Sequence, residues 1–165
     1  SYFDMVRPGI LLHGFGTASP ESMELREVLT LKSAVVRLDP VAAGAEISYM
    51  GNFIAEKPRL IATVAIGYAD GYLRCLSGKG EMLVHGQRVS QVGNICMDQC
   101  MIDVTDVLRV KVGDEVVLYG KQGEAFISVS EVSEWAQTVP HEILTSVKRI
   151  PKYYYFQDFE EEDCI

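Results

Sequence analysis

Arg7 is the first candidate binding residue of the chain. It lies in an otherwise apolar run, "DMVRPGILLHG" (residues 4–14), and Pro8 and Gly9 follow it directly. A guanidinium stays protonated at every physiological pH, so it donates hydrogen bonds and never accepts them. Proline removes a backbone donor, and glycine tolerates conformations that other residues avoid. This combination predicts a cation that holds an acceptor group; the alternative is a surface arginine at the end of a strand.

Tyr49, in "EISYMGNF" (residues 46–53), is a candidate for proton transfer. A phenol has an ordinary pKa near 10, so it acts as a base at neutral pH only when its surroundings tune it. Taken by themselves, these residues favour a strand tyrosine that packs its ring. Cys96 and Cys100 are not expected to bind a metal, because two thiols cannot complete a tetrahedral site. The four cysteines lack CxxC spacing, which indicates reduced thiols in a cytoplasmic protein.

Composition narrows the class of protein. The chain has 165 residues, of which 48% are hydrophobic, and these values are typical of a globular domain. Its net charge of −8 argues against a nucleic-acid backbone or an anionic membrane surface as the main partner. Part of that charge comes from "DFEEED" (158–163), which we expect to be a solvated tail. No apolar stretch approaches the roughly 20 residues that span a bilayer.

The elements that position these residues are mostly strands. The opening segment, residues 1–14, is typical of a strand and its exit. Residues 19–29 favour a short helix or ordered linker, with Ser19 as the cap and Pro20 in the first turn. Short strands with turns between them then predict a closed or nearly closed β-barrel. The expected strand segments are 29–39, 47–53, 59–67, a hairpin over 80–93 around His85-Gly86-Gln87, 99–106 and 110–120.

Two helices and a strand are expected near the end of the chain. "SVSEVSEWA" (128–136) carries a capping box from Ser128 to Glu131. "TVPHEILTSV" (138–147) has Thr138 as its expected cap, and "RIPKYYYF" (149–156) has the composition of a closing strand.

An ordered set of motifs resembles the C-terminal part of the alanine racemase family, whose members use pyridoxal 5′-phosphate (PLP) to make D-alanine for peptidoglycan. The motifs are "VRPGILLHG", "ISY", "TVAIGYADGY", "VGNICMDQCMIDVTD", "VGDEVVLYG" and the "EIL" after Pro140-His141. The family pairs an N-terminal (β/α)₈ barrel with a C-terminal β-domain. The resemblance therefore implies that residues 1–14 end the barrel, 15–29 form a linker or short helix and 30–155 form the β-domain. The run of acidic residues indicates that 156–165 form a disordered tail.

The resemblance implies a cofactor-binding role for four residues. Arg7 matches the arginine that hydrogen-bonds the pyridine nitrogen of PLP. That bond keeps the nitrogen unprotonated and weakens the ring as an electron sink. Gly9 and Ile10 match residues whose backbone N–H groups bind the PLP phosphate. His141 stands where many relatives have a tyrosine that contacts the same phosphate.

A second group is implied to act on the substrate. Tyr49 matches the tyrosine that serves as the base on one face of the amino acid, opposite the lysine that binds PLP covalently. Met97 matches a residue whose N–H contacts the substrate carboxylate, with Asp98 beside it. Tyr68 matches a tyrosine that narrows the substrate entrance, and Arg74 an arginine at its mouth. If these matches did not hold, Met97 would be a core residue and Tyr68 an aromatic residue in a turn.

Several positions depart from the common family pattern. Asn94 stands where arginine is common, Met50 replaces the glycine of "SYG", and Phe53, His13 and His141 replace frequent tyrosines. Because of these departures, the chain could instead belong to the related serine racemases, a branch in which some members are fused to membrane segments. A different class of function also stays open, in which the chain is a non-catalytic accessory or docking module and not part of an enzyme.

No lysine of this chain matches the lysine that binds PLP in the family; the seven present are Lys32, Lys57, Lys79, Lys111, Lys121, Lys148 and Lys152. We therefore expect racemase activity from a longer protein and none from this chain alone. The family forms homodimers with shared active sites, so Tyr49 is expected to serve the partner subunit. The expected location is the cytoplasm, or the cytoplasmic portion of a membrane-anchored enzyme.

Overall fold

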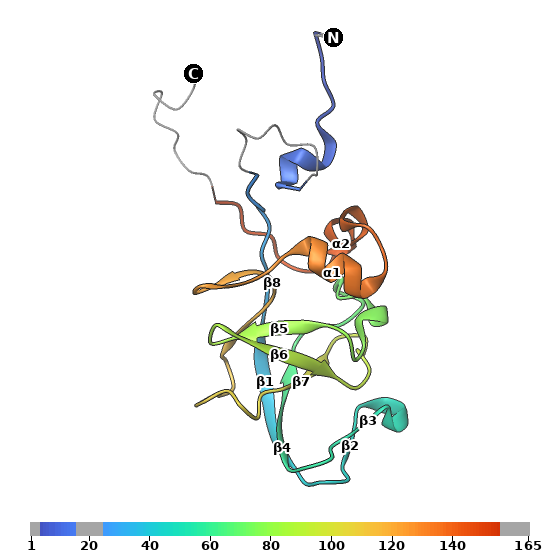
Figure 1. Cartoon of the computed structure of the whole chain (residues 1–165), viewed down its shortest axis with the longest axis vertical. Coiled ribbons are helices and arrows are strands. Elements are labelled where there is room, and N and C mark those ends of the chain that lie inside the picture. Colours follow the sequence, from blue (N-terminus) through green and yellow to red (C-terminus); the bar gives the residue numbers. More distant parts are fainter. Residues whose placement is uncertain (1–3, 16–24, 156–165) are drawn as a thin grey trace.

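The longest strand, β1 (Leu31–Val41), joins the two halves of a closed β-barrel (Figure 1). The computed structural model describes residues 4–15 and 25–155. The first part of β1 pairs antiparallel with β8 (Glu115–Gln122), and the remainder pairs with β4 (Arg59–Val64). A register shift at Val36 marks a β-bulge, which bends the strand where it changes partners.

The barrel closes through one ring of antiparallel pairings. Its order is β1-β4-β7-β6-β5-β8, and β8 returns to β1. The other strands of the ring are β5 (Glu81–Val84), β6 (Gln87–Val92) and β7 (Cys100–Asp103). A short strand, β9 (Ala125–Ile127), extends the sheet beyond β8. The predicted closed, mainly β fold is therefore confirmed.

Apolar side chains from the ring fill the barrel interior. Val64, Val84, Ile102 and Leu118 come from four different strands, and each is fully buried. Burying a side chain of this size stabilises the fold by about 1.5–3 kcal/mol. The core therefore depends on long-range pairing of strands rather than on any single segment.

The β5–β6 hairpin turns at His85-Gly86, as its sequence predicts. Both residues have positive φ, 52° and 75°, which is the requirement of a two-residue type I′ turn. His85 Nε2 lies 2.8 Å from Asp114 Oδ2, and the same carboxylate accepts a bond from Lys111 N at 2.9 Å. The hairpin tip is thus attached to the loop that leads into β8.

Replacing Asp114 by asparagine should lower the resistance of the chain to urea at pH 6–7. The Lys111 N–H and, to a lesser degree, His85 hold the pKa of Asp114 below its ordinary value. A lowered pKa means that the stabilisation is present above the unfolded-state pKa of about 4 and is lost as the pH falls through the folded-state pKa. The urea midpoints of wild type and Asp114→Asn should therefore differ at pH 6, begin to approach each other below about pH 4, and meet only below the folded-state pKa of Asp114. Equal midpoints at pH 6 would contradict the prediction.

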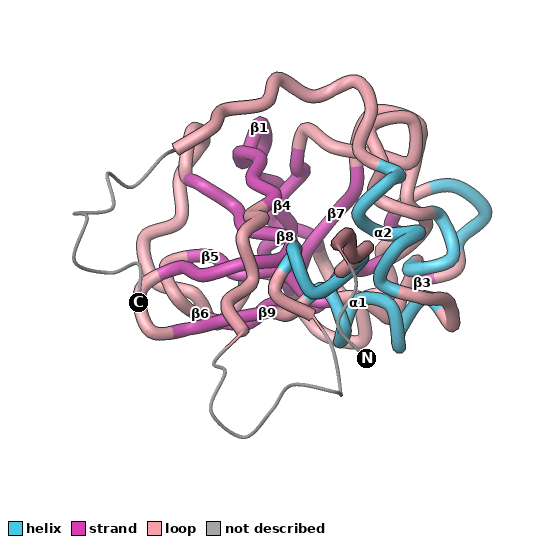
Figure 2. The backbone as a smooth tube through the Cα atoms, turned by 90° about the horizontal axis from the view of Figure 1, so that it is seen from above, coloured by secondary structure: helices cyan, strands magenta, loops and turns pink. Residues whose placement is uncertain are grey.

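The two helices pack against each other to one side of the barrel (Figure 2). Helix α1 (Val129–Ala136) begins as predicted, with the Ser128 hydroxyl accepting a bond from Glu131 N at 3.0 Å. Helix α2 (Pro140–Ser146) is capped by Val139, so the prediction of a Thr138 cap is wrong. Pro140 occupies the first helical position and forces the residue before it into an extended conformation. Thr138 instead hydrogen-bonds the Glu142 carboxylate.

Three expected strands differ in the structure. Residues 4–8 have no regular structure and continue into the 3₁₀ helix η1 (Gly9–His13). Residues 47–53 are divided into β2 (Glu46–Ile47), the 3₁₀ turn η2 (Tyr49–Gly51) and β3 (Phe53–Ile54). Residues 151–155 are exposed and extend along no strand of the barrel. A strand needs a neighbour for its N–H and C=O groups, and the apolar composition of these segments does not supply one.

The predicted linker lies only partly within the described residues. Residues 25–29 have no regular structure, so the expected helix does not reach them. Ser19, Pro20 and the acidic tail (156–165) lie outside the described residues. Among the residues that the structure describes, no helix has the length and apolar character needed to cross a membrane.

Candidate functional site

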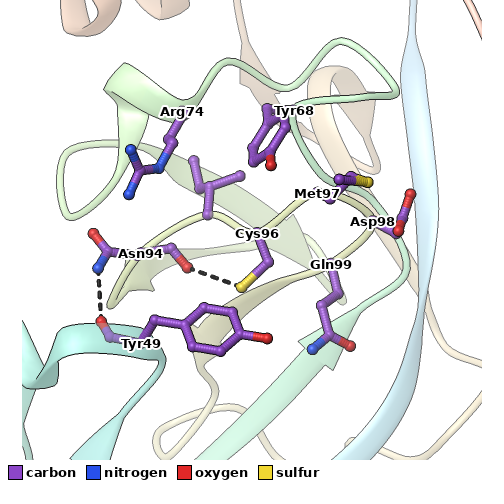
Figure 3. Close-up of a pocket in the computed structure, with 9 residues that line it drawn as sticks. Tyr49, Tyr68, Arg74, Asn94, Cys96, Met97, Asp98 and Gln99 are labelled. Atoms are coloured by element: carbon purple, nitrogen blue, oxygen red, sulfur yellow. Dashed lines mark hydrogen bonds between the residues drawn. The ribbon is translucent and has the colours of Figure 1, made fainter.

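A cleft of about 480 Å³ opens beside Tyr49 (Figure 3). Four separate segments form it: η2, the turn after β4, the 3₁₀ helix η3 (Arg74–Leu76) and the loop between β6 and β7. Its lining residues are Tyr49, Tyr68, Arg74, Asn94, Ile95, Cys96, Met97, Asp98 and Gln99. The fold thus brings together every residue that the sequence analysis assigns to substrate.

Tyr49 lies at the tip of a tightly turned loop between β2 and β3. The residues on either side of it, Ser48 and Met50, have positive φ of 70° and 66°. Non-glycine residues in this region cost about 1–2 kcal/mol each, so neighbouring structure must hold the loop. The Tyr49 residue is 70% exposed, which overturns the alternative of a tyrosine that packs its ring in the domain.

Two motifs, "IGYADG" (66–71) and "CMDQ" (96–99), pack backbone against backbone at the floor of the cleft. Tyr68 N donates to Cys96 O, and Ala69 N donates to Met97 O, both at 3.0 Å. A Cβ at Gly67 would lie 2.2 Å from Met97 O, so a side chain there would force the two segments apart. "IGYADG" and "CMDQ" therefore act as one structural unit.

Met97 and Tyr68 both present surface to the cleft. Met97 is 52% exposed and Tyr68 is 42% exposed. Met97 is therefore no core residue, whereas Tyr68 does begin a turn, as its alternative interpretation states. By contrast, Cys100 is fully buried, and burial raises the pKa of its thiol well above the ordinary range. Cys100 accordingly packs as a neutral core residue, while the half-buried Cys96 lines the cleft.

Arg149 is a site residue that the sequence analysis missed. Its Nη1 lies 3.4 Å from Asp98 Oδ1, and its Nε lies 4.0 Å from Asp70 Oδ1. Asp70 Oδ2 also accepts a bond from Gly67 N at 3.0 Å. Arg149 thus connects the C-terminal segment with both motifs at the rim of the cleft.

Ser77 and Gln91 position the Arg74 side of the cleft. The Ser77 hydroxyl donates to Arg74 O at 2.6 Å and accepts from Ile95 N at 2.9 Å. The buried Gln91 side chain donates to the carbonyls of Val92 and Gly93, both at 2.9 Å. No motif marks these residues, because their partners are brought to them by barrel closure.

The four predicted cofactor-binding residues lie outside this cleft. Arg7 is exposed just before η1, and Gly9 and Ile10 are the first residues of that helix. Ile10 packs against the core of the domain. His141 is exposed in the first turn of α2. The chain therefore carries two separate groups of predicted site residues.

Comparison with known proteins identifies the family. A sequence profile described as "Alanine racemase, C-terminal domain" matches residues 28–154. The chain is 42% identical over 159 residues to an alanine racemase of Thermodesulfovibrio yellowstonii, covering 96% of this chain and 42% of that protein. It is 44% identical over 154 residues to an alanine racemase of Halothermothrix orenii, covering 92% and 41%. This chain belongs to the alanine racemase C-terminal domain family.

Solved structures agree with this assignment. Alanine racemase from Bartonella henselae with covalently bound pyridoxal phosphate has a TM-score of 0.82 and 37% identity, covering 90% of this chain and 40% of that one. Alanine racemase from Bacillus anthracis with bound L-Ala-P has a TM-score of 0.77 and 40% identity, covering 85% and 36%. The chain thus spans about two fifths of the length of these relatives.

Proposed function

We propose that this chain is the C-terminal domain of a PLP-dependent racemase that interconverts L- and D-alanine for peptidoglycan synthesis, and that Tyr49 is its catalytic base. The observation that carries the proposal is the placement of Tyr49 in a cleft with Tyr68, Arg74, Met97 and Asp98. Racemisation needs one base on each face of the α-carbon, because the proton leaves on one side and returns on the other. Tyr49 Oη is the group of this chain that takes and returns that proton on one face.

The remaining cleft residues bind and orient the substrate. The Met97 backbone N–H receives the substrate carboxylate, and the Arg74 guanidinium attracts that anion at the mouth of the cleft. Tyr68 narrows the access and limits the size of the side chain that enters. Arg149 holds the Asp98 carboxylate at 3.4 Å and reduces its repulsion of an anionic substrate.

The N-terminal residues suit the binding of PLP, which acidifies the α-proton of an amino acid when bound. Gly9 and Ile10 precede the first hydrogen bond of η1, from Leu11 N to Pro8 O at 3.3 Å, so their N–H groups are free of the helix ladder. A Cβ at Gly9 would meet nothing within 4 Å, which leaves room for a phosphate. The exposed Arg7 guanidinium would donate to the ring nitrogen, and the exposed His141 would contact the phosphate.

These two groups would serve different active sites of a homodimer. Tyr49 and the cleft residues would complete the site of the partner subunit, whereas Arg7, Gly9, Ile10 and His141 would bind the cofactor of their own chain. The separation of the two groups on this chain supports the proposal. The location that we propose is the cytoplasm, or the cytoplasmic portion of a membrane-anchored protein.

Racemisation by the full-length protein tests the proposal. When PLP is added, we expect the protein to take up the cofactor and to convert L-alanine. We expect kcat/KM for L-alanine to be at least about tenfold higher than for L-serine, because the serine side chain carries an extra hydroxyl that a pocket suited to a methyl group binds less well. Optical activity of the amino acid gives the rate for each substrate. Faster conversion of L-serine would assign the protein to the serine racemases. Absence of PLP uptake would favour the non-catalytic module.

A further inference from the structure

The loop that carries Tyr49 is held by the side chain of Asn94, a residue of the loop between β6 and β7. Asn94 Nδ2 donates to Tyr49 O at 2.7 Å (Figure 3). Asn94 is 8% exposed, so its amide group has little access to water. Breaking the bond is costly, because the buried amide N–H that loses its acceptor gains no water in exchange.

Asn52 fixes the orientation of the Asn94 amide. Asn52 Nδ2 donates to Asn94 Oδ1 at 3.0 Å, so the oxygen of the amide faces Asn52 and its nitrogen faces Tyr49. Ser48 adds a third bond, from its Oγ to Asn94 O at 2.8 Å. The residues before, at and after the turn are therefore all connected to Asn94.

The backbone around these bonds requires such support. Ser48 and Met50 have positive φ, and a Cβ at Gly93 would lie 2.7 Å from the Ser48 Cβ and 2.8 Å from Ile47 O. The turn thus lies directly against Gly93-Asn94 while storing backbone strain on both sides of Tyr49. Without the Asn94 bond, the strain would favour another conformation of the turn and move the tyrosine.

We propose that Asn94 is a positioning residue for Tyr49: through its amide it sets the place of the Tyr49 hydroxyl in the cleft. The catalytic part of this inference rests on the proposed function, since it assumes that Tyr49 transfers a proton. The structural part, the dependence of the Tyr49 position on Asn94, does not.

Asn94→Asp in the full-length protein tests both parts. The substitution keeps the size of the side chain and replaces the donor with an acceptor, which the Tyr49 carbonyl repels. Displacement of a reacting group by about 1 Å costs on the order of 10²-fold in rate, and we expect a loss of kcat of that order. Exchange of the α-proton of L-alanine in deuterated buffer should fall more than exchange from D-alanine, because Tyr49 acts on one face only. A general electrostatic effect of the new charge would lower both equally, since both enantiomers carry the same carboxylate.

A second readout needs neither substrate nor PLP. In protein labelled with 3-fluorotyrosine, the ¹⁹F signal of Tyr49 is assigned by its loss in Tyr49→Phe. We expect this signal to shift or broaden in Asn94→Asp and in the uncharged Asn52→Ser, while the signals of the other tyrosines stay in place. Gln87→Glu, at an exposed position of β6, is the matched amide-to-acid control and should leave both the signal and the activity unchanged.

An unchanged Tyr49 signal, or an unchanged ratio of L to D exchange, in Asn94→Asp would overturn the inference. If Asn94→Asp fails to fold, the ¹⁹F signal of Asn52→Ser tests the inference instead. A Tyr49 signal in that variant identical to wild type would also overturn the inference. If the wild-type protein racemises neither alanine nor serine, the proposed function fails. The fluorine signal then still decides whether Asn94 positions Tyr49.

Discussion

Replacement of Tyr49 by phenylalanine in the full-length protein should lower α-proton exchange from L-alanine by about 10²–10⁴-fold, the range that a general base contributes. Phenylalanine keeps the ring and removes the hydroxyl that carries the proton. Tyr49 is 70% exposed at the tip of η2, so the substitution leaves the barrel core untouched. PLP should remain bound, because Arg7, Gly9, Ile10 and His141 lie outside the cleft of Tyr49.

The measurement is the loss of the α-proton signal by ¹H NMR in deuterated buffer, with each enantiomer separately. Exchange from D-alanine should fall less, since the base on the opposite face is intact. Tyr154→Phe is the matched control, because Tyr154 is 74% exposed and does not line the cleft. Exchange from L-alanine at the wild-type rate in Tyr49→Phe would remove Tyr49 from the mechanism.

Two inactive variants should restore activity to each other when their subunits are exchanged. One is Tyr49→Phe, and the other lacks the lysine that binds PLP in the N-terminal part of the full-length protein. If each active site combines the cofactor of one subunit with the Tyr49 cleft of the other, a mixed dimer has one site with both lesions and one with neither. Random pairing makes half of the dimers mixed, and each has one intact site of two. About a quarter of the wild-type activity should therefore return.

The control for this experiment is a pair of lesions in the same group. Tyr49→Phe mixed with Arg74→Ala should give no activity above the mean of the two separate variants, because both residues line one cleft and every site then carries a lesion. Native mass spectrometry reports the fraction of mixed dimers in both experiments. Mixed dimers of the first pair without any recovered activity would contradict a shared site.

Local features of the fold are readable from short stretches of the chain. The turn at His85-Gly86 and the cap at Ser128 depend on residues within three positions of one another, and both were predictable. The strands of the barrel ring were predictable as well, because apolar runs bounded by turn residues have few other stable conformations. The closed barrel followed from the number and spacing of those strands.

The failed local predictions have a shared cause. The segments 4–8 and 151–155 have strand-like composition, yet a strand forms only where a neighbour satisfies its backbone. At Thr138 the prediction failed for a local reason. Pro140 occupies the first position of the helix, so the cap is Val139, one residue later than predicted. Composition alone does not rank such competing effects.

The candidate site divides in the same way. Its motifs indicated Tyr49, Tyr68, Arg74, Met97 and Asp98, and these residues do meet in one cleft. The residues that hold them, Asn94 and Arg149, lie 45 positions from Tyr49 and 51 positions from Asp98. Each such contact is worth only about 1 kcal/mol net, too little to impose a pattern on the sequence. It forms because the pairing of β7 with both β4 and β6 brings distant loops to the same end of the barrel, and that pairing is a property of the whole sheet.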